Sequence, residues 1–345
     1  MKKSLIALAV AGALTAPMIA QADATLYGIA QFRGVAEDDK SFNSKMAKTR
    51  LGVKGTVDND IEGLTTGFQF EWEFDGNGSA TSATNSSSVA MRKSNVYMKG
   101  DFGILSLGRQ NNPANPAEAM TDILGNDSAA FHMNPDRLGN VVAYVTPTFG
   151  GFHAVAAVIS EGSSDTDSDA LGADDVDATV LAVNWAGAGF GVAAAITNVE
   201  GGTTTANVDG SAVTYSASAD AFVATTAAAE VADFDIITAG VNYTGIENVY
   251  LAASYSKKDT DGTSVEPETI DLAASYTMGK TTLAAIYSVH DTDVSGEDDQ
   301  EQFLVGVRYA LGAKASVGVD YASYNSDAED AGKNDTLTLE YTLSF

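Results

Sequence analysis

The sequence predicts an all-β fold, a transmembrane up-and-down antiparallel β-barrel of sixteen strands, and three observations support this prediction. Apolar residues alternate with polar ones in segment after segment, as expected for strands with one apolar and one polar face. Each segment is about ten residues long, which is the length with which a tilted strand crosses a bilayer. The connections between segments alternate between short and long, as they do in outer-membrane barrels.

The strand segments follow one another along the whole chain after residue 22. In the segment 281–290 the outward set is Leu283, Ala285, Tyr287 and Val289, and the residues between them form the other face. We expect the apolar face of each strand to meet lipid and the polar face to line a lumen. The sixteen predicted strands are 24–35, 46–57, 64–74, 89–99, 103–110, 138–147, 151–160, 178–186, 189–198, 234–243, 247–256, 268–277, 281–290, 301–310, 314–324 and 335–345.

The connections fall into two classes. The short class carries glycine and forms tight turns, at 58–63, 100–103, 147–151, 186–189, 244–248, 278–280 and 311–314. The long class is mostly rich in Asp, Glu, Ser, Thr and Gly, at 36–45, 75–88, 111–137, 161–177, 199–233, 257–267, 291–300 and 325–334. Both chain ends then lie on the short-turn side. The Ala- and Thr-rich connection 199–233 is long enough to hold one more hairpin, which would raise the strand count to eighteen.

The N-terminal 22 residues predict a secretory signal peptide. Lys2 and Lys3 precede an apolar run that starts at Leu5, and the triplet Ala20-Gln21-Ala22 is typical of a cleavage site. The apolar run is too short for a membrane-spanning helix, which needs about 20 residues. We therefore expect residues 1–22 to be removed and residues 23–345 to form one transmembrane β-barrel domain that is exported from the cytoplasm.

The last predicted strand, 335–345, ends "LTLEYTLSF" and has the clearest alternation in the chain. In a closed barrel this strand pairs along both edges, so its backbone groups do not fray. Tyr341 and the terminal Phe345 are aromatic residues of the kind found at the level of the lipid headgroups.

Composition argues against several function classes. The formal charge is −27, with 46 Asp and Glu against 19 Lys and Arg, and so acidic a chain does not suit nucleic acid. There is no cysteine, which excludes thiol catalysis and cysteine-type zinc sites. His132, His153 and His290 lack metal-ligand spacing, no G-x-S-x-G motif occurs, and the acidic loops fail the EF-hand template. We expect neither an enzyme nor a cofactor or metal site.

Several stretches, in order and spacing, resemble the Gram-negative general diffusion porins, which are trimeric barrels of sixteen strands. The final "YTLSF" is similar to the terminal-Phe signal that the outer-membrane assembly machinery of such proteins reads. The matching stretches are "ATLYGIAQF", "KTRLGVKG", "GFQFEWEFDG", "MKGDFGILSLGRQ" and "DRLGNVVAYVTPTFGGFHAVAAV".

The resemblance implies that the third long loop, from about Gln110 to Asp136, folds into the barrel and narrows a pore. The loop would supply an acidic side of the constriction from Glu118, Asp122 and Asp127. Basic residues of the opposite wall would face these carboxylates. The wall residues that the resemblance and the alternation of strand faces assign are Arg33, Arg50, Lys54, Arg92 and Arg137.

Two further expectations concern which way side chains point. On strict alternation, Lys93, Asn95 and Tyr97 lie on the face opposite Arg92, which makes the outer face of this strand polar. The resemblance places that part of the wall against neighbouring subunits. Tyr27 and Trp72 are candidates for aromatic residues of the lumen.

The sequence thus predicts a general porin of the cell outer membrane, through which ions and small hydrophilic solutes diffuse passively. The acidic balance predicts a preference for cations. The expected partners are two further copies in a homotrimer, outer-membrane lipid and lipopolysaccharide, and the assembly machinery. A substrate-selective porin for sugars or oligosaccharides, and a surface adhesin barrel, remain as alternatives.

Overall fold

The computed structural model describes residues 22–74, 89–124, 131–160, 176–201, 211–216, 221–225 and 232–345. Apart from Ala22, the predicted signal peptide lies outside these residues, and so does Asp127. No helix in the described part of the chain is long and apolar enough to cross a membrane.

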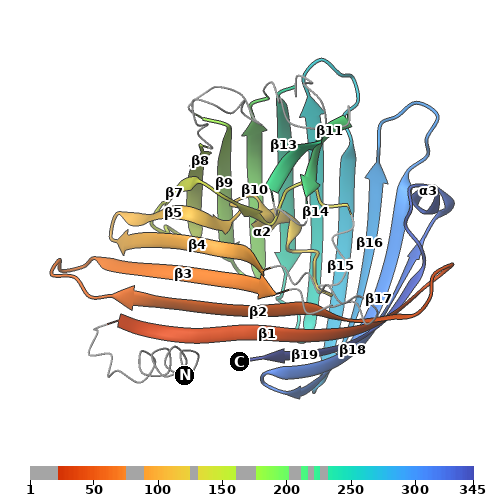
Figure 1. The fold of residues 1–345 in the computed structure, drawn as a ribbon, viewed down its shortest axis with the longest axis horizontal. Coiled ribbons are helices and arrows are strands. Elements are labelled where there is room, and N and C mark those ends of the chain that lie inside the picture. The colour runs from red at the N-terminus through yellow and green to blue at the C-terminus, as the bar shows by residue number, and fades with distance from the viewer. Residues whose placement is uncertain are drawn as a thin grey trace, which may run out of the picture.

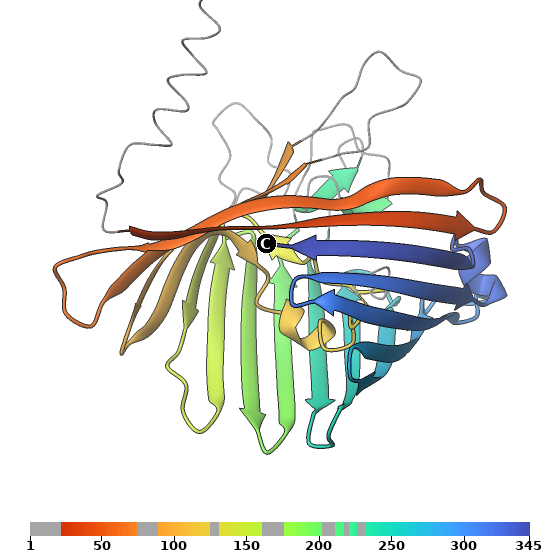
Figure 2. The same ribbon diagram turned by 90° about the horizontal axis from the view of Figure 1, so that it is seen from below.

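All the described strands except β11 (Ser211–Ser216) and β12 (Ala221–Thr225) form one closed antiparallel barrel (Figures 1 and 2). The short β6 and β7 both pair with β5 and together take one position in the wall, so the predicted count of sixteen strands is confirmed. The wall strands are β1 (Ala22–Glu37), β2 (Asn43–Val57), β3 (Thr65–Phe74), β4 (Val89–Gly100), β5 (Gly103–Asn111), β6 (Arg137–Leu138), β7 (Val141–Val145), β8 (Phe152–Ile159), β9 (Ala178–Gly187), β10 (Phe190–Val199), β13 (Phe234–Tyr243), β14 (Val249–Thr260), β15 (Glu268–Met278), β16 (Thr281–Asp291), β17 (Gln300–Gly312), β18 (Ala315–Tyr324) and β19 (Thr336–Ser344).

The barrel closes where the first and last strands pair. β19 pairs with β18 on one edge and with β1 on the other, and Arg33 lies opposite Glu340 in the second pairing. The amide of Gly28 donates to the carbonyl of Phe345, and the amide of Phe345 donates back, each at 3.1 Å. The alternation is as predicted, since Leu339 is 50% exposed on the outer face and Thr338 only 2% exposed on the inner face. Closure therefore leaves no free edge at the C-terminal strand.

The connection between β10 and β13 does contain a hairpin, as the sequence allowed. β11 (Ser211–Ser216) and β12 (Ala221–Thr225) pair with each other in a separate two-stranded sheet. β10 pairs directly with β13, so this hairpin takes no place in the wall. The alternative of eighteen wall strands is therefore wrong.

A β-bulge in β4 changes which side chains face inward. Glu71 pairs with Lys93 while Trp72 pairs with Met91, which leaves Arg92 as an extra residue. A bulge breaks the strict alternation of faces, so the consecutive residues Arg92 and Lys93 both point inward while Met91 points outward. The polar outer face expected for this strand is wrong: Asn95 is buried on the inner face, and the exposed outer positions are Met91, Val96 and Met98.

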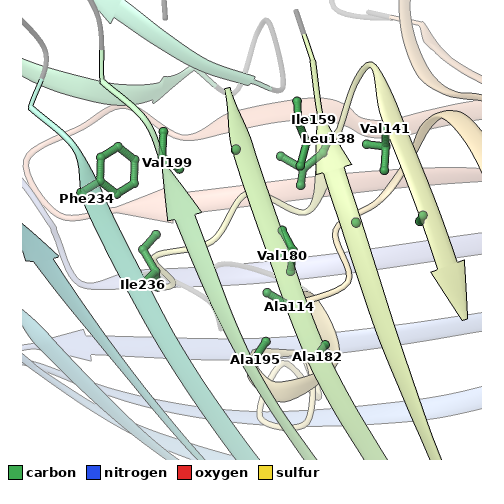
Figure 3. Close-up of a cluster of buried hydrophobic side chains, with 13 residues drawn as sticks. Ala114, Leu138, Val141, Ile159, Val180, Ala182, Ala195, Val199, Phe234 and Ile236 are labelled. Atoms are coloured by element: carbon green, nitrogen blue, oxygen red, sulfur yellow. The ribbon is translucent and has the colours of Figure 1, made fainter. Parts of the chain in front are cut away.

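The third loop lies inside the barrel and packs against its inner wall. Its short helix α2 (Asn115–Glu118) is drawn between the strands of opposite walls in Figures 1 and 2, and it contacts β10, β13 and β14. Ala114, just before α2, packs with buried Val, Ile and Ala side chains from β7 to β13, including Val141, Ile159 and Val180 (Figure 3). Apolar contacts thus hold the loop against this part of the inner wall. A second helix, α3 (Ser326–Asp330), lies between β18 and β19.

Candidate functional site

The third loop leaves the wall and returns to it at one point. The amide of Asn112 donates to the carbonyl of Asp136 at 2.9 Å, and the Asn112 side chain donates to the carbonyl of Pro135 at 3.0 Å. The Asn112 Oδ1 atom also accepts from the amide of Ala114, which begins the turn into α2. One buried asparagine therefore ties both ends of the loop together.

The backbone of α2 lies directly on the wall at Gly240 of β13. A Cβ atom at this position would collide with the carbonyl oxygen of Ala117. A glycine is needed here because any side chain would push the helix into the lumen.

Glu118 is the main polar contact between α2 and the wall. Its Oε1 atom accepts from the Ser256 hydroxyl of β14 at 2.7 Å, from the Met133 amide at 3.2 Å and from the Asn134 side chain at 3.4 Å. The residue is fully buried. The sequence placed Glu118 on the pore-facing side, whereas the structure places it behind the loop, where it joins the outgoing and returning segments to β14.

A second chain of polar contacts runs from the loop to β15. The Thr121 hydroxyl lies 2.8 Å from that of Ser254, which donates to Asp271 at 2.9 Å. His132 of the returning segment lies 3.7 Å from the same carboxylate. The hydroxyl of Tyr250 donates to the carbonyl of Met120 at 2.8 Å. Both segments of the loop are therefore bound to neighbouring wall strands.

Across the lumen, β1 to β4 carry a connected set of charged side chains. Arg92 bridges two carboxylates, with its Nε atom 2.8 Å from Glu71 and its Nη1 atom 2.6 Å from Glu73. Glu73 also binds Arg50 at 3.2 Å, and Glu71 accepts from the hydroxyl of Tyr27 at 3.0 Å. Ion pairs of this kind, partly shielded from water, hold long side chains in defined positions.

The remaining predicted wall residues join this set from both sides. Arg33 pairs with Glu340 at 3.2 Å, and Arg137 lies close enough to Arg50 and Lys93 for their charges to interact. Lys54 lies further along β2, with its ammonium 5.4 Å from the centre of the Tyr27 ring. We call Arg33, Lys48, Arg50, Arg92, Lys93, Arg137, Glu71, Glu73 and Glu340 the wall cluster.

Asp122 is a loop carboxylate that faces the wall cluster, and Asp136, at the end of the loop, pairs with Arg137 at 3.4 Å. Asp122 is exposed, and its charge interacts with that of Lys48, whose other charged neighbours are Arg33, Arg50 and Glu340. Of the three predicted loop acids, the structure thus brings Asp122 to the wall cluster and buries Glu118, while Asp127 lies outside the described residues.

Glu71, Glu73 and Lys93 were missed by the sequence reasoning. The alternation in "FQFEWEF" carries a signal for the first two, since Gln69, Glu71 and Glu73 share a face. The same alternation places Trp72 outward, where its ring lies 6.3 Å from that of Phe70. The expectation that Trp72 lines the lumen is therefore wrong, whereas Tyr27 does face inward.

This geometry suits passage of ions and solutes. Fixed charges of both signs face each other across a lumen that the loop narrows, and such rows set a transverse field. Among the described residues, no three acidic or histidine side chains are grouped as a protein metal site requires.

Comparisons with known proteins give the family. The sequence profile described as Gram-negative porin matches residues 7–244 and 211–344. Outer membrane porin protein 32 of Delftia acidovorans is 35% identical over 175 residues, which are 45% of this chain and 48% of that protein, so the alignment spans about half the length of this relative.

Solved structures with the same fold include a Salmonella typhi OmpF complex with daunomycin, with a TM-score of 0.69, 18% identity and coverage of 93% of this chain and 97% of that one. An anion-selective porin from Comamonas acidovorans has a TM-score of 0.65 and 18% identity, and the match covers 94% of this chain and all of that one. At such identities the likeness shows the fold alone. The profile match over most of the chain shows that this protein belongs to the Gram-negative porin family of the cell outer membrane.

Proposed function

We propose that this protein is an outer-membrane channel through which ions and small hydrophilic solutes diffuse passively. The observation that carries the proposal is the third loop, bound inside a closed barrel with Asp122 turned toward the wall cluster. A lumen narrowed in this way excludes solutes by size. The hydrogen bonds of Glu118, Thr121 and Tyr250 keep the loop in place, so the size limit is a property of the folded protein.

The wall cluster acts on charged solutes at the constriction. Low-dielectric walls focus the field of fixed charges, and an ion beside them is less screened than at an open surface. A unit charge at about 4 Å interacts with an ion by about 1 kcal/mol in water and about 4 kcal/mol at an effective dielectric constant of 20. Charges at the narrowest point therefore dominate over charges in the outer loops, which salt screens beyond about 10 Å.

The cation preference expected from the net charge of the chain is not supported. That expectation rested on acidic loops, whereas six basic side chains of the wall cluster stand against five carboxylates: Glu71, Glu73, Glu340, and the loop residues Asp122 and Asp136, the last of which pairs with Arg137. One porin of the same fold is described as anion-selective, which does not fit a cation preference. We propose that the local excess of basic groups makes the constriction favour small anions over cations.

The sugar-selective alternative loses its support, because Trp72 lies on the outer face and only Tyr27 of the two aromatic candidates lies inside. We retain as proposals a homotrimer, contact with lipid and lipopolysaccharide, and recognition of Tyr341 and Phe345 by the assembly machinery.

A planar-bilayer recording in a salt gradient tests the function. The purified protein is expected to give stepwise conductance and a reversal potential of the sign for anion preference. A protein that inserts without conducting contradicts the channel. A conducting protein with a cation-type reversal potential contradicts only the proposed selectivity.

A further inference from the structure

The tip of the described part of the third loop is held at a place separate from the contacts of Glu118. Leu124, the last residue described before the gap at 125–130, is 5% exposed. Its side chain packs with Ile286 and Leu304 and with small inward-facing side chains of β14, β15, β16 and β18: Ala252, Ala273, Ala284 and Ala322. Alanines on four neighbouring wall strands leave the space that the leucine fills.

One arginine of the wall binds the backbone at the same place. The Nη2 atom of Arg308, on β17, donates to the carbonyl of Leu124 at 3.0 Å. The guanidinium also binds both oxygens of Asp320 on β18, at 2.5 and 2.6 Å. Its Nε atom lies 3.7 Å from Glu340, which pairs with Arg33. A carboxylate that binds two nitrogens of a planar guanidinium fixes its orientation. The N–H group that points toward Leu124 is therefore held in place.

The wall is shaped for this arrangement by two glycines. Arg308 lies opposite Gly318 in the pairing of β17 with β18, and a Cβ atom at Gly318 would collide with the guanidinium. Gly306 lies opposite Asp320, and a Cβ atom there would collide with the Asp320 carboxylate and approach the side chain of Leu124. The absence of two side chains lets Arg308 lie flat across β18 while Leu124 approaches the wall.

We propose that Arg308 is a positioning residue that holds the third loop against the wall at Leu124 and thereby sets the size limit of the pore. This inference rests on the proposed channel function. Arg308 acts through the carbonyl of Leu124, because a loop released at this residue can move away from β14 to β18. Loss of the contact therefore changes which uncharged solutes pass, an effect that the charge of Arg308 alone does not produce.

The test compares three variants in proteoliposomes, with swelling rates for uncharged sugars of increasing size. Arg308→Gln and the charge-balanced double variant Arg308→Gln/Asp320→Asn both lose the contact with Leu124, and both are expected to pass the largest sugars several-fold faster relative to the smallest. Asp320→Asn alone keeps an arginine that can reach Leu124, and it is expected to keep the wild-type size dependence while its reversal potential shifts toward anions.

Lys257→Gln is the matched control, because it removes one positive charge from β14 at a lysine paired with Glu266 and Glu268. Its size dependence is expected to match wild type. The double variant removes the Asp320 carboxylate together with its arginine partner, so it provides the second test if Arg308→Gln alone fails to assemble.

Wild-type size dependence in the Arg308 variants that assemble overturns the inference while leaving the channel function standing. A wild-type protein through which no sugar and no ion passes overturns the proposed function instead.

Discussion

Replacing Glu118 by alanine is expected to release the third loop from the wall. The variant leaves the buried hydroxyl of Ser256 and the half-buried amide of Met133 without an acceptor. A buried donor without a partner costs about 1–3 kcal/mol, which applies to Ser256, and the half-buried amide of Met133 adds less. The longer bond from Asn134, at 3.4 Å, adds little.

This free-energy cost destabilises the docked loop, because one donor lies in the returning segment of the loop and the other on β14. Since every 1.4 kcal/mol is a factor of ten, a cost of about 1–3 kcal/mol lowers the ratio of docked to undocked loop roughly 5-fold to 150-fold. In single-channel recordings, the Glu118→Ala variant is expected to show a larger conductance and frequent transitions between conductance levels. Limited proteolysis at the loop provides a second reading, with faster cleavage in the variant.

Glu118→Gln is the control for this prediction. The glutamine keeps an acceptor oxygen for Ser256 and Met133, and it removes a carboxylate whose hydrogen-bond partners are neutral groups, so the loop is expected to stay docked. The ion selectivity of this variant is expected to equal that of wild type, since Glu118 does not face the lumen. A Glu118→Ala protein with wild-type conductance and proteolysis, or a Glu118→Gln protein as disturbed as the alanine variant, would refute the reasoning.

Three further predictions follow from the structure. Asp122→Asn removes a negative charge beside Lys48 and is expected to shift the reversal potential toward anions; an unchanged potential would show that Asp122 does not act on the ion path. Deletion of Phe345 removes two backbone hydrogen bonds to Gly28, worth about 1–3 kcal/mol together. The deletion is expected to lower the yield of folded barrel on refolding, and an unchanged yield would count against a role of Phe345 in barrel closure. Burial raises the pKa of the Asp335 carboxyl, but hydrogen bonds from Tyr321, Tyr324 and Ser323 outweigh burial and hold this pKa below its usual value. The stability that Asp335 contributes is therefore fully present above the unfolded pKa of about 3.9 and is lost as pH falls through the lower folded pKa. In denaturant titrations below pH 4, wild type is expected to lose more stability than Asp335→Asn. Parallel curves of stability against pH for the two proteins would contradict this.

The barrel itself could be predicted because its determinants are local. Alternation along each strand, the length of the strands and the sorting of short and long connections are all visible in the sequence, and the sixteen wall positions follow from them. The last strand is the clearest case, with Leu339 outside and Thr338 inside as expected.

The errors arose where a single residue or a contact distant in sequence decides the orientation. The bulge at Arg92 turns Lys93, Asn95 and Tyr97 from the predicted outer face to the inner face. A prediction from strict alternation does not detect one inserted residue. Glu118 lies on the wall side of its loop because Ser256, 138 residues away, supplies a donor there. Arg308 was missed for the same reason, since its contact with Leu124 joins residues 184 positions apart.

Net charge is a weak guide to ion selectivity for a similar reason. The total of −27 includes long acidic loops, while the sign of the field at the constriction depends on the few side chains that the barrel brings together. The wall cluster draws its members from β1, β2, β3, β4, β6 and β19, and their grouping follows from strand pairing rather than from composition.

The central claim is that a water-filled path runs between Asp122 and the wall cluster. The chain has no cysteine, so a single Asp122→Cys substitution gives one reactive thiol. Addition of a bulky thiol reagent to this variant during single-channel recording is expected to lower the current, while the same reagent on Leu337→Cys, at an exposed outer position, leaves it unchanged. Full labelling of Asp122→Cys without any change in current would contradict the claim.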